Sequence, residues 1–283
     1  YSIAIKASKI GYITKMKTDS ASTIYLTNED LKEGEYIKYD TGISDVGENG
    51  IVICRILYDT NSEYGLQIIT DKTIAQISLG GNDNYLDWIA ARDSYNNAII
   101  TLNAKTEKYL NRVYATDARC VGSVPVLQNG TFVDKNSENA GPVKLKFTST
   151  VEGSNNIKEA DNNWETDEEQ MKKLNILITG ENYWMASRNV QSYASGCDFG
   201  IRIVNVVGEM IKNWLGSLGS NVAYGFSYTR GLRPCFTLRS DIEITGGNGT
   251  SDLPYTMEWY DLRGSKWLRY WLSKNMYTVV GTK

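Results

Sequence analysis

Few residues of this chain could carry out nucleophilic or metal chemistry. The sequence contains no histidine and four cysteines, namely Cys54, Cys120, Cys197 and Cys235. Without histidine, the Ser–His and Cys–His nucleophile pairs, the usual proton shuttle and the most common transition-metal ligand are all excluded. The cysteines are widely spaced and form no Cys-x-x-Cys pair, which argues against a zinc site. We therefore expect no enzyme activity, no cofactor and no bound metal.

The sequence leaves the redox state of the cysteines open. Buried free thiols, which pack as small hydrophobic side chains, are one alternative. Disulfides are the other, with three pairings available to four cysteines. If one bridge forms, Cys197 with Cys235 is the first candidate, because both flank the polar and aromatic part of residues 182–241.

Residues 182–241 favour ligand recognition instead. They combine Tyr and Trp with many Ser, Asn and Gly residues, the mixture that antibody paratopes use to obtain contact area at low entropic cost. We expect the binding face here, with Trp184 and Phe199 in the core beneath it. The candidate ligand contacts are Asn189, Ser192, Tyr193, Asn205, Asn213, Trp214, Ser217, Asn221, Tyr224, Ser227, Tyr228 and Arg230.

Arg233 and Pro234 have a different interpretation. Proline restricts the backbone of the turn, and the planar fork of an arginine can bind several backbone carbonyls or one carboxylate. We favour a structural role for Arg233 over ligand contact.

The composition restricts the class of protein and its partners. The 283 residues suit one large domain or two ordinary ones, and 41% hydrophobic with 22% charged residues is typical of a soluble globular chain. No apolar run reaches the length of a membrane span. The net charge of −3 and the lack of a dense basic stripe argue against nucleic acid as a partner. The chain begins at Tyr1, which we interpret as a trimmed ectodomain.

Local patterns predict the elements that position the candidate residues. Short β-branched or aromatic runs predict strands at 23–26, 36–39, 51–58, 65–70, 142–148, 183–187, 199–204 and 235–238. Apolar periodicity predicts a helix at about 87–113. Thr166 and Glu169 form a capping box that starts a second helix, ending by Gly180. We interpret 189–198, 205–214 and 216–230 as loops.

Several stretches resemble one family of bacterial surface proteins. They are GEYIKYD, ICRILYD…YGLQIITDK, NNAIITLN…YLN…YATDARCVGSVP, WETDEEQMKKLNILI, NYWMASR, FGIRIVN, GLRPCFTLRSDI and ITGGNGTSDLPY, spread over about residues 30–256. The pair NYWMASR and GLRPCFTLRSDI is the most specific. They are similar to clostridial-type, pilin-like surface proteins, and the carboxyl-terminal module resembles the variable proteins of diversity-generating retroelements.

This resemblance implies an α+β fold. A small antiparallel β-sheet region would be followed by a C-type-lectin-like domain, similar to formylglycine-generating enzymes, with two main helices and irregular loops. The implied organisation is an N-terminal segment at 1–30 (a remnant of a pilin-like helix, or a strand), a module at 31–256 with its binding face at 182–241, and an aromatic tail at 257–283.

The resemblance also implies a function. The expected protein is extracellular, displayed on a cell surface or filament, and binds a protein or glycan ligand on another cell or surface by adhesion or recognition. Self-assembly into a filament is a further expected contact, with the membrane reached only through an N-terminal helix absent from this sequence. The alternatives are a phage tail receptor-binding protein and, less favoured, a cysteine-dependent oxidase-like enzyme.

Overall fold

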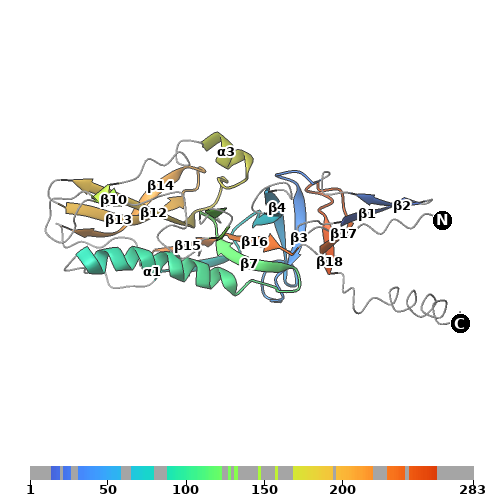
Figure 1. The fold of residues 1–283 in the computed structure, drawn as a ribbon, viewed down its shortest axis with the longest axis horizontal. Coiled ribbons are helices and arrows are strands. Elements are labelled where there is room, and N and C mark those ends of the chain that lie inside the picture. Colours follow the sequence, from blue (N-terminus) through green and yellow to red (C-terminus); the bar gives the residue numbers. More distant parts are fainter. Residues whose placement is uncertain are drawn as a thin grey trace, which may run out of the picture.

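The structure is a computed structural model. It describes residues 14–19, 22–26, 31–58, 65–79, 88–122, 127–128, 131–132, 146–147, 157–158, 168–193, 196–218, 228–239 and 242–259. Three β-sheets follow one another along an elongated molecule (Figure 1).

The central sheet has five strands in the order β3-β4-β5-β16-β7, and every neighbouring pair is antiparallel. Its strands are β3 (Tyr36–Asp40), β4 (Ile51–Tyr58), β5 (Gln67–Thr70), β16 (Pro234–Leu238) and β7 (Ala115–Cys120). The strands predicted at 51–58 and 65–70 correspond to β4 and β5, which pair as an antiparallel hairpin.

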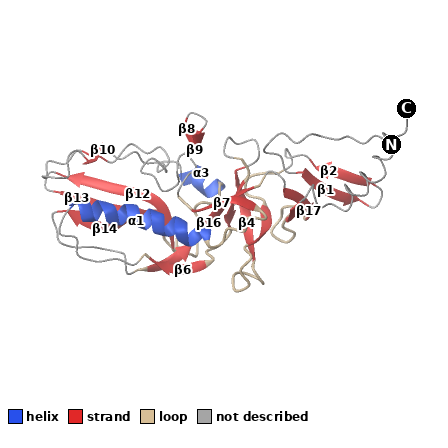
Figure 2. Cartoon of the chain, turned by 60° about the horizontal axis from the view of Figure 1, so that its bottom comes forward, coloured by secondary structure: helices blue, strands red, loops and turns tan. Residues whose placement is uncertain are grey.

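A second sheet, which we call the long-stranded sheet, has the order β14-β13-β12-β15-β6. Its strands are β12 (Tyr183–Tyr193), β13 (Gly196–Val204), β14 (Met210–Leu218), β15 (Thr229–Leu232) and β6 (Ala75–Ser78). Helix α1 (Trp88–Glu107) runs along this sheet and contacts β12, β13 and β14 (Figures 1 and 2).

The third sheet has the order β18-β17-β1-β2 and lies at the other end of the molecule (Figure 1). It consists of β1 (Thr14–Asp19), β2 (Ser22–Leu26), β17 (Ile242–Gly246) and β18 (Thr256–Trp259), with β1 parallel to β17. Residues 14–19 and 22–26 are therefore strands, and the rest of the predicted N-terminal segment at 1–30 lies outside the described residues. The remaining described elements are β8 (Leu127–Gln128), β9 (Thr131–Phe132), β10 (Lys146–Phe147), β11 (Ile157–Lys158) and α3 (Glu168–Lys173).

The strands β5 and β16 of the central sheet are buried on both faces. In β16, Cys235 belongs to the core shared with α1 and the long-stranded sheet, whereas its neighbour Phe236 belongs to a second core on the opposite face. In β5, Ile69 and Ile68 divide between the two cores in the same way. Successive strand residues point to opposite faces, so a strand covered on both sides carries a continuous apolar run. This explains the unalternating sequences of β5 and β16.

A β-bulge joins the two five-stranded sheets. Trp184 pairs with Ile203 and Arg188 pairs with Ile201, so β12 advances four residues while β13 advances only two. The extra residues bend β12 toward β7, where the Ala186 N–H donates to the Val121 carbonyl at 2.7 Å. Gly122 permits this approach, because it has a φ of 96° and a Cβ there would lie 2.9 Å from the Cβ of Met185.

The expected α+β fold with two main helices is wrong, because the described chain is mostly β-structure. The second predicted helix contains only the six residues of α3. The described helix begins at Glu168, and Thr166 of the predicted capping box lies outside the described residues. Asn175 adopts a φ of 56° and the Ile176 N–H returns to the Met171 carbonyl at 2.8 Å, which ends the helix.

The region interpreted as a loop at 189–198 is largely strand, and the region at 205–214 is a turn at 205–209 followed by the first residues of β14. Residues of β12, β13 and β14 pair in two continuous antiparallel ladders there. Helix α1 is confirmed but ends at Glu107 instead of continuing to about 113. After it, Tyr109 and Leu110 make i to i−3 hydrogen bonds, the tighter turn that commonly closes a helix.

Candidate functional site

Three of the predicted ligand contacts meet on the long-stranded sheet. Arg230 of β15 extends over Trp184 of β12, with its guanidinium carbon 5.1 Å from the ring, and its Nη2 donates to Asn213 Oδ1 of β14 at 3.1 Å. The ring of Tyr228 lies 5.2 Å from the same guanidinium carbon. We call Trp184, Asn213, Tyr228 and Arg230 the Arg230 cluster.

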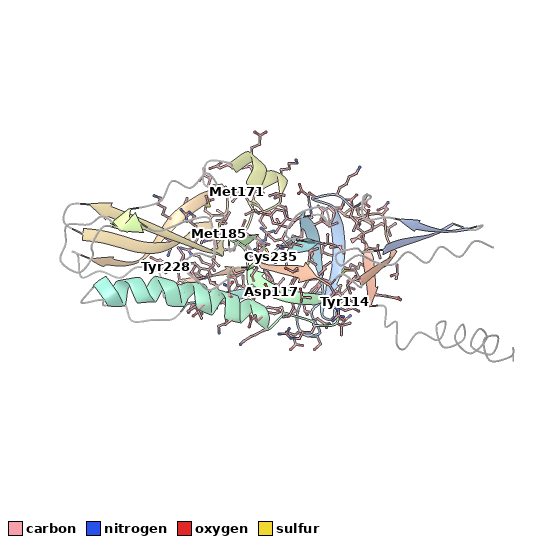
Figure 3. The ribbon with its side chains drawn as sticks, viewed as in Figure 1. Tyr114, Asp117, Met171, Met185, Tyr228 and Cys235 are labelled. Carbon is pink, nitrogen blue, oxygen red and sulfur yellow. The ribbon has the colours of Figure 1, made fainter. Side chains whose placement is uncertain are left out.

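The Arg230 cluster joins a rigid base to an exposed rim. Trp184 is fully buried and its indole N–H donates to the Ile77 carbonyl at 3.1 Å, so the ring is held in place. Tyr228 is 55% exposed, and it lies in the half of the molecule that holds the long-stranded sheet, away from Cys235 in the middle (Figure 3). Arg230, partly buried, is oriented between a fixed ring and a solvent-facing one.

Within the described part of the chain, two N–H donors of this cluster find no hydrogen-bond partner. Arg230 Nε and Asn213 Nδ2 are buried and find no acceptor among the described residues. An unpaired buried donor costs about 1–3 kcal/mol, so native structures rarely leave one without a reason. An acceptor brought by a ligand would remove that cost.

Burial also affects the charge of the cluster. Desolvation lowers the pKa of Arg230, and the interaction with Tyr228 opposes this effect. An arginine remains protonated at neutral pH even so. The cluster therefore offers one fixed positive charge and several N–H donors beside an exposed aromatic ring.

Two predicted contacts are placed differently from the expectation. Asn213, expected to be exposed, is buried at 9% exposure because it faces the same side of the sheet as its neighbour Ile201. Asn205 follows β13 at the end opposite to Tyr193, and its Oδ1 accepts from the backbone N–H groups of Val207 and Glu209. Asn205 is thus a turn residue. Turns and binding loops share polar residues such as asparagine, so the sequence alone did not separate the two roles.

The other candidates are placed only in part. Asn189, Ser192 and Tyr193 belong to β12, and Trp214 and Ser217 belong to β14. Their side chains lie outside what the structure describes, as does the side chain of Phe199. Asn221, Tyr224 and Ser227 lie entirely outside the described residues.

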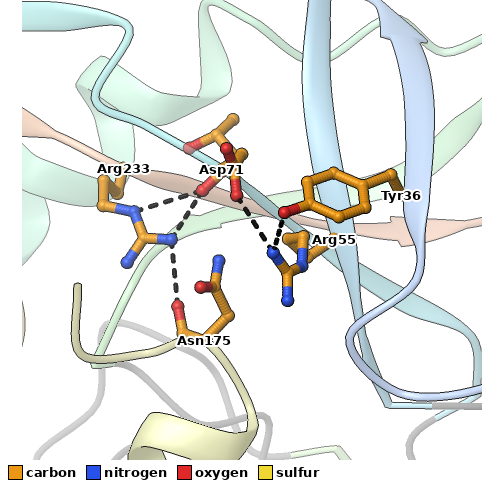
Figure 4. A network of polar contacts seen from close by, with 6 residues as sticks. Tyr36, Arg55, Asp71, Asn175 and Arg233 are labelled. Carbon is orange, nitrogen blue, oxygen red and sulfur yellow. Dashed lines mark hydrogen bonds and ion pairs between the residues drawn. The ribbon is translucent and has the colours of Figure 1, made fainter. Parts of the chain in front are cut away.

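Arg233 has the structural role that was predicted. Its guanidinium is fully buried and donates to the carbonyls of Thr70 and Ile176 at 2.6–3.1 Å. It also donates to the carbonyl of Asn175 at 3.0 Å (Figure 4). Its own carbonyl accepts from Val121 of the central sheet. Arg233 thereby joins the crossover between β15 and β16 to the segment after α3.

Sequence reasoning missed a second polar site next to Arg233. Arg55 stacks on Tyr36, donates to its hydroxyl and forms an ion pair with Asp71 at 3.6 Å (Figure 4). An open groove of about 350 Å³ adjoins it, lined by Asp71, Lys72, Asn175, Leu177, Ile178, Thr179 and Glu181. Both carboxylates are already engaged, Asp71 by Arg55 and Glu181 by the Thr73 N–H at 2.6 Å. No local sequence signal joins these segments.

The three described cysteine side chains, Cys54, Cys120 and Cys235, are buried thiols. Cys54, Cys120 and Cys235 form no disulfide, so the suggested bridge between Cys197 and Cys235 is wrong. Desolvation is the largest cause that raises the pKa of each of these three thiols. A buried thiol that stays protonated is a poor nucleophile, and packing explains these residues.

Within the described part of the chain, no group of three or more Cys, Asp or Glu side chains could hold a metal ion. Of the described helices, none has both the length and the apolar character to span a bilayer. No family model, curated protein or solved structure matches this chain.

Proposed function

We propose that this chain is a ligand-binding protein that uses the Arg230 cluster as part of its recognition face. The observation that carries this is the unpaired Arg230 Nε and Asn213 Nδ2 beside the exposed ring of Tyr228. Aromatic and arginine side chains dominate the energy of many binding sites, and here a fully buried tryptophan holds the arginine in place.

The buried cysteines favour binding over cysteine chemistry. Their raised pKa values, caused first by desolvation, leave little thiolate at neutral pH. None of the four residues of the Arg230 cluster is a carboxylate, and the two carboxylates that line the groove near Arg233, Asp71 and Glu181, are already engaged. Recognition needs only preorganised donors and an aromatic surface, both of which the cluster supplies.

Display at a cell surface or on a filament is part of the proposal. It rests on the sequence resemblance to pilin-like surface proteins, with a glycan or protein on another surface as the ligand. The mixture of Tyr, Ser and Asn on β12 and β14 supports it, because these side chains adapt to different ligands without a large entropic cost.

Binding of the purified chain to an array of glycans and a panel of extracellular proteins tests the proposal. We expect at least one ligand, and a Tyr228→Ala variant should bind it about tenfold more weakly or worse, as interface tyrosines commonly do. Leu253→Ala is the matched control, since Leu253 is 56% exposed and follows β17 in the distant third sheet. A chain that binds nothing, or equal losses in the two variants, would refute the proposal.

A further inference from the structure

We propose that the Arg230 cluster binds the carboxylate of an acidic sugar. This inference rests on the proposed binding function and specifies the ligand of the same site. It starts from the chemistry of the unpaired groups: the cluster has buried donors to satisfy, and Asn213 Oδ1 already accepts from Arg230.

The type of donor determines the type of ligand group. The guanidinium of Arg230 is a planar fork, and Asn213 Nδ2 adds a further N–H next to it. Such a fork matches the two oxygens of a carboxylate, and the charge makes these hydrogen bonds about twice as strong as neutral ones. A neutral hydroxyl group could pair with these donors but would leave the positive charge unmatched.

The charge of the cluster distinguishes a carboxylate from a phosphate. Arg230 is the single cation of the four residues. Lys212, next to Asn213 on β14, lies opposite Arg202 in the strand register, so both are on the other face of the sheet from Asn213. Arg188 of β12 is in the same cross-strand row as Asn213, through Ile201, and its side chain lies outside what the structure describes. A carboxylate carries one negative charge, which Arg230 alone can match. A phosphate group carries up to two and usually requires more than one cation or a helix N-terminus.

The exposed ring of Tyr228 distinguishes a sugar from a peptide side chain. With 55% of its surface exposed and Arg230 beside it, the ring offers a broad, rigid and amphipathic surface. A pyranose ring that bears a carboxylate presents an apolar C–H face and a charged group side by side. It can therefore cover Tyr228 while its carboxylate contacts Arg230.

The probes are a sialylated oligosaccharide and a uronate oligosaccharide, each with its carboxyl-reduced counterpart, together with a peptide rich in Asp and Glu. Affinities are measured by titration calorimetry with the full chain. We expect at least one acidic oligosaccharide to bind, and its carboxyl-reduced form to bind about tenfold more weakly or worse, in line with the value of a charged hydrogen bond. High salt should weaken the binding, because it screens partly exposed charges.

Two variants test the role of Arg230. Arg230→Gln should abolish the preference for the acidic form. Arg230→Lys should keep the preference for the acidic form only in part, because lysine keeps the positive charge but lacks the planar fork of N–H donors. Arg239→Gln is the matched control, and circular dichroism melts show that each variant folds. If Arg230→Gln unfolds, Arg230→Lys alone carries the test.

The outcomes separate this inference from the proposed function. Equal binding of acidic and reduced sugars, an unchanged preference in the Arg230→Lys variant, or binding of the acidic peptide alone would overturn the acidic-sugar inference. In each case the proposed function would survive if Tyr228→Ala still lowered the affinity. If no probe of the acidic set binds while the broader array yields a ligand whose binding depends on Tyr228, the acidic-sugar inference fails and the proposed function stands.

Discussion

Tyr183 and Arg233 hold each other in the centre of the fold. The guanidinium carbon of Arg233 lies 5.0 Å from the Tyr183 ring centroid, and its Nη1 donates to the Tyr183 hydroxyl at 3.3 Å. That hydroxyl donates to the Ile176 carbonyl at 2.5 Å. Both residues are fully buried, so one contact links the start of β12, the crossover into β16 and the end of the α3 segment.

Arg233→Met should therefore destabilise the whole protein. Methionine fills similar space but leaves the carbonyls of Thr70, Asn175 and Ile176 without this donor. We expect the free energy of unfolding to fall by about 3–5 kcal/mol, measured by urea denaturation. Arg239→Met, a partly exposed control, should change it by about 0.5 kcal/mol or less. Similar values for the two variants would show that the network contributes little.

Gly122→Ala tests the close approach of β7 to the β12 bulge. Both Gly122 and Gly180 have a positive φ, of 96° and 84°. A Cβ at Gly122 would lie 2.9 Å from Met185 Cβ, whereas nothing lies within 4 Å of one at Gly180. Each alanine should cost about 1–3 kcal/mol for its backbone. Gly122→Ala should cost more than Gly180→Ala, because its new Cβ also presses against Met185. Thermal melts of the two variants measure the difference.

If Gly122→Ala and Gly180→Ala lower the melting temperature equally, the contact with Met185 is relaxed without cost. The joint between the two sheets would then be looser than the bulge geometry indicates.

The buried thiols predict how stability depends on pH. Burial raises the pKa of Cys54, Cys120 and Cys235 above the usual 9.0, so the folded state holds these protons more tightly than the unfolded state. Their contribution to stability is therefore complete below about pH 9 and lost as the pH rises further. Urea unfolding at pH 7, 9 and 10 should show a falling free energy of unfolding.

A thiol-reactive dye gives an independent measurement. In a Cys197→Ser variant, the folded protein should react slowly even at pH 9, and urea should release three reactive thiols. Rapid labelling of the folded variant would contradict the burial of these cysteines.

Four strands of the central sheet, β3, β4, β5 and β16, could be predicted because their signals are local, whereas β7 was not predicted. Residues 51–58 and 67–70 have β-branched side chains on both sides of a polar connection, and this pattern identifies a hairpin. Arg233 was also interpretable, because proline after arginine limits the backbone and leaves the fork to bind carbonyls. In both cases neighbouring residues contain the information.

The long-stranded sheet was predicted only in part. In β12 and β14, Asn, Ser and Tyr alternate with apolar residues, and a polar strand face has the composition of a loop. The capping-box pattern at Thr166 predicted where a helix starts but gave no length, and the left-handed Asn175 follows the six residues of α3. The contact between Arg230 and Asn213 crosses from β15 to β14 with two strands between them, and only the sheet order creates it.

Asn213→Asp should separate stability from binding. Asn213 Oδ1 already accepts from Arg230, and Nδ2 is an unpaired buried donor. The substitution removes that donor and makes the contact an ion pair, while the desolvation of a new carboxylate opposes the gain. Because Arg230 is only partly buried, we expect the free energy of unfolding to rise by about 1 kcal/mol at pH 7.

The positive charge of Arg230 should lower the pKa of the new carboxylate at position 213, and this shift determines how the stability of the variant depends on pH. The gain should be present at pH 7 and disappear as the pH falls below about 4, where the carboxylate binds a proton in the folded state. The same variant should lose any carboxylate ligand, because its own carboxylate then neutralises Arg230. Asn248→Asp is the control for an added charge, because Asn248 is exposed beyond β17 and its Oδ1 only accepts hydrogen bonds, from the N–H and hydroxyl of Thr250. A variant that is stabilised yet still binds the acidic sugar would place the ligand elsewhere on the sheet.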